Sequence, residues 1–277
     1  MLRSLDSGIS ALQQFQQGMD VIGNNIANVS TIGFKGAAVQ YADSFSQTLS
    51  GAGTAGAMQV GTGVVTSAIS NNFAQGAVSN TGVATDLAIN GNGFFTVSEP
   101  VGGAQYVTRD GEFKVDSGGY LVTTTGLRVQ GYTSFSNTTP PVGTLGDIKI
   151  DNNVAGSTAT ISSYSFDSQG NVNVRLSDGK QFVRGQILLT SYLSPEQLVK
   201  EGNNLFSGMS GAGAVIQSGV PGTNGLGNLV GSSLEMSNVD LAGQMASMIT
   251  TQRAFEASSK IITTSDEMLQ TLVNLKR

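Results

Sequence analysis

Three groups of residues in this chain have types and spacings that binding or catalytic sites use. Asp110, Glu112 and Asp116 place three carboxylates close together, as a metal loop or an acid–base pair requires. The glycine-rich run Asn90–Gly93 resembles a loop that cradles phosphates, and Ser30-Thr31 offers two hydroxyl groups as nucleophiles. These groups are the starting candidates for chemistry.

None of the three groups has the partners that its chemistry needs. Asn90–Gly93 is followed by the strand-like run Phe94–Val97, with no helix and no lysine of the kind that contacts phosphates, so it predicts a turn. The carboxylates lack the spacing of a calcium loop and fall on a turn with its flanks. Ser30-Thr31 has no base, because the chain contains no histidine. We therefore expect no enzyme, no metal and no cofactor.

The composition narrows the possible partners. Charged residues make up 12% of the chain, about half the usual share, and glycine contributes 37 of 277 residues. Cysteine and tryptophan are absent as well, which removes disulfides and thiolate ligands. The net charge of −5 argues against nucleic acid. No apolar run is long enough to span a membrane, and polar residues interrupt the N-terminus too often for a cleavable signal peptide.

Both ends of the chain have the periodicity of amphipathic helices. The N-terminal pattern has steps of three or four residues, and it weakens at Gly8, Gly18 and Gly23. The C-terminal pattern is a heptad repeat that starts at Leu241. Such helices are marginal in isolation and need a partner, so we expect the two ends to pack. Ser237 or Asn238 is the expected N-cap of the second helix. The residues expected to form the packed, assembly-competent seams are Leu5, Ile9, Leu12, Met19, Ile22, Ile26, Leu241, Met245, Met248, Phe255, Ile262, Leu269 and Leu272.

The middle of the chain has a different character. Short alternating runs such as 105–108, 112–115, 120–123 and 172–176 are separated by Gly, Asn and Asp turns. This pattern predicts an antiparallel β domain. Residues 50–63 are rich in Gly, Ala and Thr and predict an extended linker. The fold class is therefore α+β, with long terminal helices in a coiled-coil-like domain and a mainly antiparallel β domain between them.

Several motifs, taken in order, resemble the bacterial flagellar hook and basal-body rod family. They are MDVIGNNIANVSTIGFK at 19–35, FAQGAVSNTGVATDLAINGNGFFTV at 73–97, YVTRDGEFKVDSGGYLV at 106–122, VQGY at 129–132, EGNNLF at 201–206, and the last 45 residues from Ser233. The resemblance extends over nearly the whole chain. It implies a structural protein of motility that polymerises into a helical tube.

The resemblance also implies a domain plan and a set of partners. Residues 1–34 and 236–277 would form the terminal helical domain lining an axial channel, 35–72 an extended connector, and 73–235 the β-rich domain. The implied partners are further copies of the chain, other rod, hook and junction proteins, a hook cap protein and the type III export apparatus. The implied location is the hook or basal body, reached without cleavage of a signal peptide.

The chain resembles two members of this family, the hook subunit and the distal rod protein. The motifs IGNNIAN, ADSF, VQGY and SNVDLAGQM favour the hook subunit, but the segment 133–162 is short where hook proteins carry an extra outer domain. That length is more like the distal rod protein. We favour a short hook-type subunit, with the distal rod protein next and another rod component after it. From a different class, a secreted β-rich adhesin or carbohydrate-binding module, or a glycosidase built on two carboxylates, stays open at this point.

Overall fold

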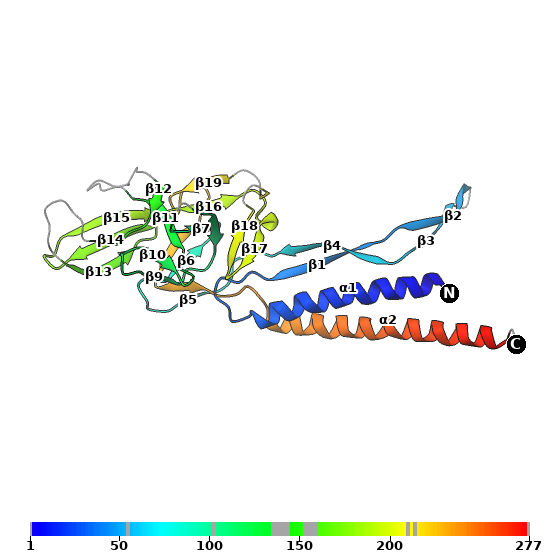
Figure 1. The fold of residues 1–277 in the computed structure, drawn as a ribbon. Helices are drawn as coiled ribbons and strands as arrows, with labels where there is room; N and C mark the ends of the chain where they lie inside the picture. The colour runs from blue at the N-terminus through cyan, green and yellow to red at the C-terminus, as the bar shows by residue number, and fades with distance from the viewer. Residues whose placement is uncertain are drawn as a thin grey trace. The chain divides into compact units, whose positions relative to one another are not determined.

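The computed structural model describes residues 2–53, 56–100, 103–133, 145–151, 160–208, 211–212 and 215–275. It confirms the α+β class, with one helix at each end and mostly antiparallel strands between them (Figure 1). The chain divides into two compact units. The first comprises residues 1–29, 36–72 and 239–277, and the second comprises residues 30–35 and 73–238. The predicted segment 133–162 lies partly outside the described residues.

The elements have the following bounds. The helices are α1 (Leu2–Ala27), α2 (Leu241–Leu275) and the short 3₁₀ helix η1 (Pro195–Gln197). The strands are β1 (Ala37–Asp43), β2 (Ser46–Gly53), β3 (Gly56–Gly61), β4 (Val64–Asn71), β5 (Val78–Asn80), β6 (Leu87–Asn90), β7 (Phe94–Ser98), β8 (Gln105–Thr108), β9 (Phe113–Val115), β10 (Leu121–Thr123), β11 (Arg128–Tyr132), β12 (Leu145–Asp147), β13 (Ile161–Phe166), β14 (Asn171–Leu176), β15 (Gln181–Ile187), β16 (Leu189–Tyr192), β17 (Val199–Gly202), β18 (Leu205–Ser207), β19 (Val215–Gly219), β20 (Asn228–Gly231) and β21 (Ser233–Glu235).

The first unit contains the two long helices side by side and antiparallel, with the two chain ends at the same end of the pair (Figure 1). The N-terminal end of α2 lies beside the C-terminal end of α1, where the side chains of Asn25 and Gln244 are hydrogen-bonded at 3.1 Å. Asp240 caps α2 by accepting hydrogen bonds from the backbone N–H groups of Ala242 and Gly243. The expectation that Ser237 or Asn238 is the cap is therefore wrong.

A β-ribbon completes the first unit. Strands β1 and β4 pair over their whole length, and β2 pairs with β3 farther along the same hairpin. The segment 50–63, predicted as a linker, therefore lies within a hydrogen-bonded hairpin in its described residues. The small residues that suggested a linker leave the backbone free to pair, because strand pairing needs only N–H and C=O groups.

The second unit is built on one large antiparallel sheet. Along its main path the strand order is β13-β14-β15-β11-β7-β8-β18-β17, and β16 joins β7 to β19. The strands predicted at 105–108, 112–115, 120–123 and 172–176 are confirmed as β8, β9, β10 and β14. Two short pairs, β20 with β6 and β21 with β5, bind the last strands before α2 to the first strands of the unit.

The core of the second unit is apolar and closely packed. Leu87, Phe95, Val129, Val172 and Leu189 are fully buried in its main cluster. A smaller cluster surrounds Phe94, whose ring lies edge-on to those of Phe73 and Phe206. Aromatic pairs of this geometry add about 0.5–1.5 kcal/mol each beyond the area they bury. This unit therefore has a hydrophobic core of its own, which is the property of a domain that folds independently.

Candidate assembly surface

The residues first considered for chemistry hold turns. The side chain of Asp110 accepts a hydrogen bond from the Glu112 N–H at 3.0 Å, and that of Asp116 accepts one from the Ser117 N–H at 2.7 Å. Burial raises the pKa of Asp110. No group of acidic residues in the described part of the chain is placed to hold a metal ion. Asp110 and Asp116 therefore hold turns, as predicted, whereas Glu112 forms an isolated β-bridge with Asp86.

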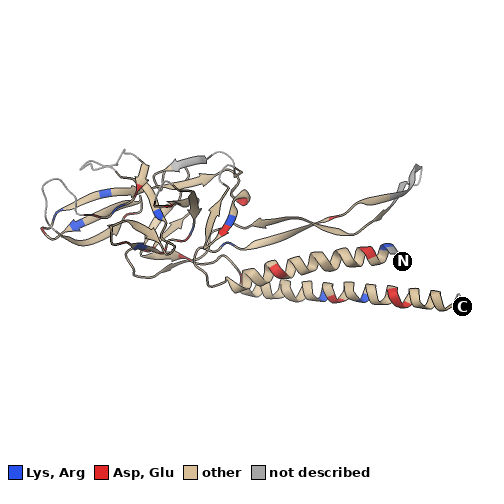
Figure 2. Cartoon of the chain, viewed as in Figure 1, with Lys and Arg blue, Asp and Glu red and all other residues tan. Residues whose placement is uncertain are grey.

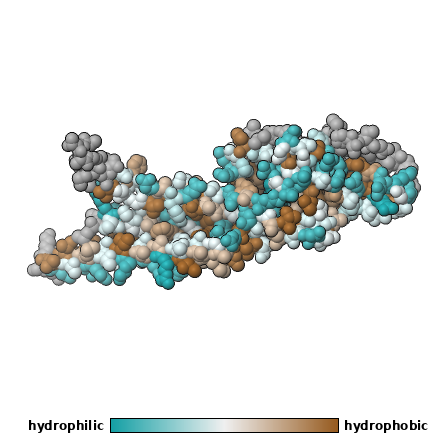
Figure 3. Space-filling model, turned by 180° about the vertical axis from the view of Figure 1, so that it is seen from behind, coloured by the Kyte–Doolittle hydropathy of each residue, from teal (hydrophilic) through white to brown (hydrophobic). Residues whose placement is uncertain are grey.

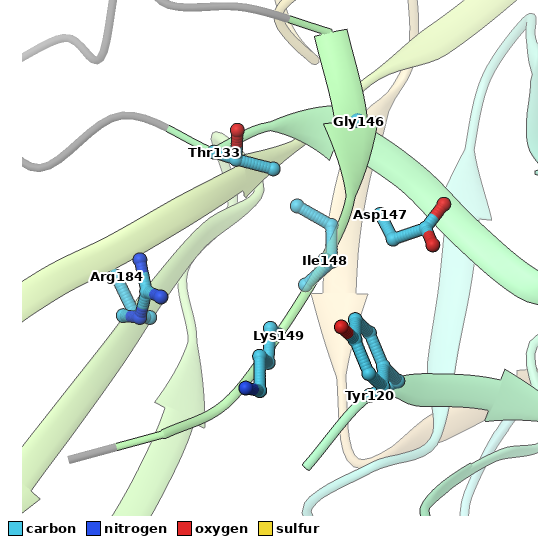
Figure 4. Close-up of a pocket in the computed structure, with 7 residues that line it drawn as sticks. All are labelled: Tyr120, Thr133, Gly146, Asp147, Ile148, Lys149 and Arg184. Atoms are coloured by element: carbon cyan, nitrogen blue, oxygen red, sulfur yellow. The ribbon is translucent and has the colours of Figure 1, made fainter. Parts of the chain in front are cut away.

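A surface hollow of about 360 Å³ on the second unit gathers charged side chains around Tyr120 (Figure 4). Lys149 and Arg184 both line it, and both form ion pairs with Asp151, at 3.3 and 2.6 Å. Asp147, also on its wall, is paired with Arg128 at 2.8 Å. Each of these charges has an ion-pair partner, so the hollow offers a ligand no unpaired charge from these groups, although the three cations outnumber the two carboxylates by one.

The predicted seam residues lie along both long helices of the first unit, and many are incompletely covered. Ile9, Leu241, Met245 and Leu272 are exposed, with fractions of 40% to 50%. The remaining nine are half-buried: Leu5, Leu12, Met19, Ile22, Ile26, Met248, Phe255, Ile262 and Leu269. Ile249, Ile261, Met268, Val273 and Leu275 add further exposed apolar side chains to α2. The two helices in one chain do not cover this apolar surface.

Small and polar residues form the line where the two helices meet. Gly8 and Gly18 are buried on α1, and Ser258 and Ser265 are buried on α2. A Cβ atom on Gly8 would lie only 3.1 Å from Cγ1 of Ile262, and one on Gly18 would strike the Tyr41 hydroxyl. Glycine at these two positions therefore lets the helices and the ribbon approach closely without displacing the side chains of Ile262 and Tyr41. Small residues occupy much of the line of contact, where Ile262 lies against Gly8, and apolar residues such as Met245 and Leu272 stay exposed.

Asn25 connects three elements of the first unit. Its side-chain amide donates to the Ala37 carbonyl at 2.7 Å and to the Gln244 side chain at 3.1 Å, and its side-chain oxygen accepts from the Ala37 N–H at 3.0 Å. The residue is 2% exposed. The periodicity of apolar residues does not indicate Asn25, because this residue is polar. The sequence indicates its burial only through its position next to Ile26, a residue of the predicted seam.

We expect Asn25→Ala to loosen this junction specifically. The Ala37 N–H loses its acceptor, and an unsatisfied buried polar group costs about 1–3 kcal/mol. Hydrogen exchange at the Ala37 amide should accelerate about tenfold or more, since 1.4 kcal/mol corresponds to a factor of ten. The matched control is Asn24→Ala at the adjacent exposed position. Unchanged Ala37 exchange in the Asn25 variant would contradict this role.

The surface of the helices has few charges and many apolar groups. Lys, Arg, Asp and Glu are widely spaced along α1 and α2 in Figure 2, and apolar groups interrupt the surface of the first unit in Figure 3. No helix in the described part of the chain is long and apolar enough to cross a membrane. Exposed apolar patches of this kind on a protein mark interaction sites.

The second unit contains a buried ionic cluster that the sequence analysis missed. Glu235 is fully buried and accepts hydrogen bonds from Lys35 at 2.7 Å, from Arg109 at 3.1 Å and from the Gly76 N–H at 2.9 Å. Lys35 is 1% exposed and Arg109 is 4% exposed. Lys35 also donates to the Ala74 carbonyl, and Arg109 donates to the Gly91 carbonyl, both at 2.9 Å. Two cations therefore share one carboxylate in a buried site.

Burial dominates the electrostatics of this cluster. Desolvation lowers the pKa of Lys35 and of Arg109, and in both cases the attraction of Glu235 opposes the shift. The Arg109 guanidinium also lies 5.2 Å from the centre of the Phe94 ring, which favours its charged form. Buried charges persist only when they are paired and hydrogen-bonded, and Glu235 supplies that pairing for both cations.

The cluster holds the segments through which the chain enters and leaves the second unit. The Gly33 N–H donates to the Glu235 carbonyl at 2.8 Å, so residues 30–35 are bound to β21. Lys200 donates to the Lys35 carbonyl, and Asn204 donates to the Ile32 carbonyl, both at 2.7 Å. Hydrogen bonds thus hold segments that are distant in the sequence around residues 30–35 and β21, the last strand before α2.

Three family models match the chain at its beginning, middle and end. The model described as flagella basal body rod protein matches residues 5–35, and the flagellar hook protein FlgE/F/G D1 domain matches residues 88–174. The model described as flagellar basal body rod FlgEFG protein C-terminal matches residues 230–275. These ranges cover most of α1, the strands from β7 to β13 with most of β6 and β14, and the whole of α2. The chain belongs to the flagellar hook and basal-body rod family and is a structural protein of the flagellar axis, not an enzyme.

Individual relatives extend this result to the full chain. A flagellar basal-body rod protein FlgG from Bacillus subtilis is 41% identical over 284 positions, and one from Borreliella burgdorferi is 37% identical over 286; each alignment covers both chains completely. A flagellar hook protein FlgE from Borreliella burgdorferi is 30% identical, and its alignment needs 444 positions to cover both chains. The hook interpretation favoured by the motifs is not confirmed, and the family replaces the secreted-module and glycosidase alternatives.

Proposed function

We propose that this chain is the distal rod subunit of the flagellar basal body. The observation that carries the proposal is length: relatives named as the rod protein FlgG align end to end in 284 and 286 positions. The hook relative aligns only when the alignment grows to 444 positions. Hook proteins carry an extra outer domain at the position of residues 133–162, where this chain has only a short segment. The short segment is therefore consistent with the difference in alignment length.

Assembly of the rod, in this proposal, buries the apolar flanks of the terminal helices between copies of the chain. Residues such as Leu241, Met245 and Leu272 are exposed in one subunit and would gain cover from neighbours. Full burial of such a side chain contributes roughly 1.5–3 kcal/mol, and one that is already about half covered gains about half of that. The coiled-coil packing expected from the heptad repeat then arises between subunits as well as within one. Contacts of this kind that do not close into a ring generate a filament.

The domain plan and the export route belong to the same proposal. Residues 1–34 and 236–277 line the axial channel, 35–72 connect, and 73–235 form the outer β-rich domain. Copies of the chain and other axial proteins are its partners, since the family is one of self-assembling axial components. We further propose export by the type III apparatus without signal cleavage, and contact with a cap protein during growth.

Cross-complementation tests the proposal. In the source bacterium lacking this gene, the Bacillus subtilis rod protein relative should restore hook and filament growth at least in part, because its length and motifs match over the whole chain. In a strain that lacks only its hook subunit, this chain should restore nothing. Rescue of the hook-deficient strain by this chain would contradict the proposal and support the hook subunit instead.

A further inference from the structure

The sequence contains three Asn-Gly pairs, Asn90-Gly91, Asn92-Gly93 and Asn224-Gly225. In such a pair the backbone nitrogen of the glycine can attack the side-chain amide carbon of the asparagine, because glycine has no Cβ to hinder the approach. The reaction needs the asparagine side chain and the glycine nitrogen to move freely. The fold restricts the movement of these groups to very different degrees in the three pairs.

Asn224-Gly225 occupies the tip of an exposed turn between β19 and β20. Residues 222–225 are all exposed, and Asn224 and Gly225 have φ angles of 52° and 81°. The Leu226 N–H donates to the Thr223 carbonyl at 2.9 Å and the Gly222 N–H donates to the Gly227 carbonyl at 3.0 Å, while the Thr223 N–H and hydroxyl both donate to the Val220 carbonyl. Within the described chain the Gly225 N–H has no acceptor, and open space surrounds Gly225. None of these hydrogen bonds involves the Gly225 nitrogen or the Asn224 side chain, so within the described chain no hydrogen bond holds the two reacting groups.

The Asn90-Gly91 pair is fixed by several contacts. The Gly91 N–H donates to the Gln75 side-chain oxygen at 2.9 Å, so the attacking nitrogen is engaged. Gln75 donates in return to the Asn90 side chain at 3.4 Å. Asn90 also ends β6 and pairs with Asn228. Several interactions must break before this pair can react.

The Asn92-Gly93 pair is fixed by burial of its glycine. The Asn92 carbonyl accepts a hydrogen bond from the Gly227 N–H at 2.7 Å. Gly93 is buried, and a Cβ on it would lie 3.3 Å from Leu189 and 3.6 Å from Leu226. Movement of Gly93 therefore disturbs the apolar core of the unit.

We propose that Asn224 is a site of spontaneous covalent modification by deamidation in the folded protein, whereas Asn90 and Asn92 are protected. The Gly225 nitrogen forms a bond to the Asn224 side-chain carbon, and the bond from that carbon to the amide nitrogen breaks, releasing ammonia. Water then opens the cyclic imide to aspartate or isoaspartate, with no oxidant or reductant. The product adds one negative charge to a chain of net charge −5.

Peptide mapping by mass spectrometry of the full-length chain, aged at mildly alkaline pH, tests this inference. Conversion at Asn224 should be at least about tenfold faster than at Asn90, because the hydrogen bonds that engage the Gly91 nitrogen and the Asn90 side chain must break before that pair can react. Asn224→Gln should abolish the signal from this turn and leave the other two pairs unchanged. In urea the three pairs should convert at similar rates, because the fold no longer separates them.

Two results would overturn the inference. One is conversion of Asn90 or Asn92 in the folded protein as fast as that of Asn224. The other is the absence of conversion at Asn224 in the folded chain, while Asn224 reacts readily in urea.

Discussion

Glu235→Gln should destabilise the second unit by about 3–5 kcal/mol, the usual cost of leaving a buried charge without its partner. The substitution keeps the shape of the side chain and a hydrogen-bond acceptor, but it leaves Lys35 and Arg109 as two buried cations with no carboxylate between them. Urea unfolding of the purified chain, followed by tyrosine fluorescence from the second unit, measures the change in the free energy of unfolding.

Two companion variants make this experiment specific. Asp178→Asn makes the same chemical change in an exposed pair, 3.8 Å from Lys180, and should cost about 0–1 kcal/mol. Lys35→Met leaves Glu235 and Arg109 as a balanced pair, so it should cost less than Glu235→Gln although it breaks the same 2.7 Å contact. A loss of stability for Glu235→Gln no greater than that of Asp178→Asn would show that the cluster does not stabilise the fold.

The loss in the Glu235→Gln variant should shrink as the pH rises. Burial lowers the pKa of Lys35 below its ordinary value of 10.5, so between the folded and the unfolded pKa the unfolded state binds more protons. Stability therefore rises with pH through that window. Removal of Glu235 removes an interaction that raises the pKa of Lys35, which widens the window towards neutral pH. Lys35→Met in the same background should abolish this part of the pH dependence.

Ile262→Asp should abolish polymerisation and leave the second unit folded. Ile262 is half-buried against Gly8 within one subunit, and we propose that neighbouring copies complete its cover. A charge placed there must lose water in every subunit contact, at a cost of several kcal/mol each time. Sedimentation and electron microscopy measure polymer, and unfolding of the second unit is measured in parallel.

The conservative variant Ile262→Leu is the control for this experiment. It keeps an apolar side chain of similar volume and should polymerise, with a loss below about 1.5 kcal/mol per subunit. Polymers of ordinary length from the Ile262→Asp variant would exclude this face of α2 from the subunit contacts.

The sequence predicts the secondary structure well because periodicity reports burial. Steps of three or four residues predict α1, and short alternating runs predict β8, β9, β10 and β14. Ile262, a member of the predicted heptad, lies against Gly8 of α1. Periodicity of large apolar residues does not predict that the most buried positions of α2 are Ser258 and Ser265, three residues after Phe255 and Ile262. Close approach at Gly8 and Gly18 decides this, and small residues give no apolar signal.

No local pattern in the sequence predicts the ionic cluster. Lys35 and Arg109 are 200 and 126 positions from Glu235, and single charged residues in a sequence are solvent-exposed in most proteins. The pairing arises only when β21 adds to β5 and residues 30–35 bind to β21, which are long-range events. The same reasoning explains why Asp240, not Ser237 or Asn238, caps α2: the cap depends on where the first helical turn begins.

Electron microscopy of basal bodies from a strain lacking this gene tests the central claim, that the chain is the distal rod subunit. The proposal predicts that assembly stops before the distal rod, so that purified basal bodies lack both a complete rod and a hook. A complete rod without a hook would identify the hook subunit instead and contradict the proposal.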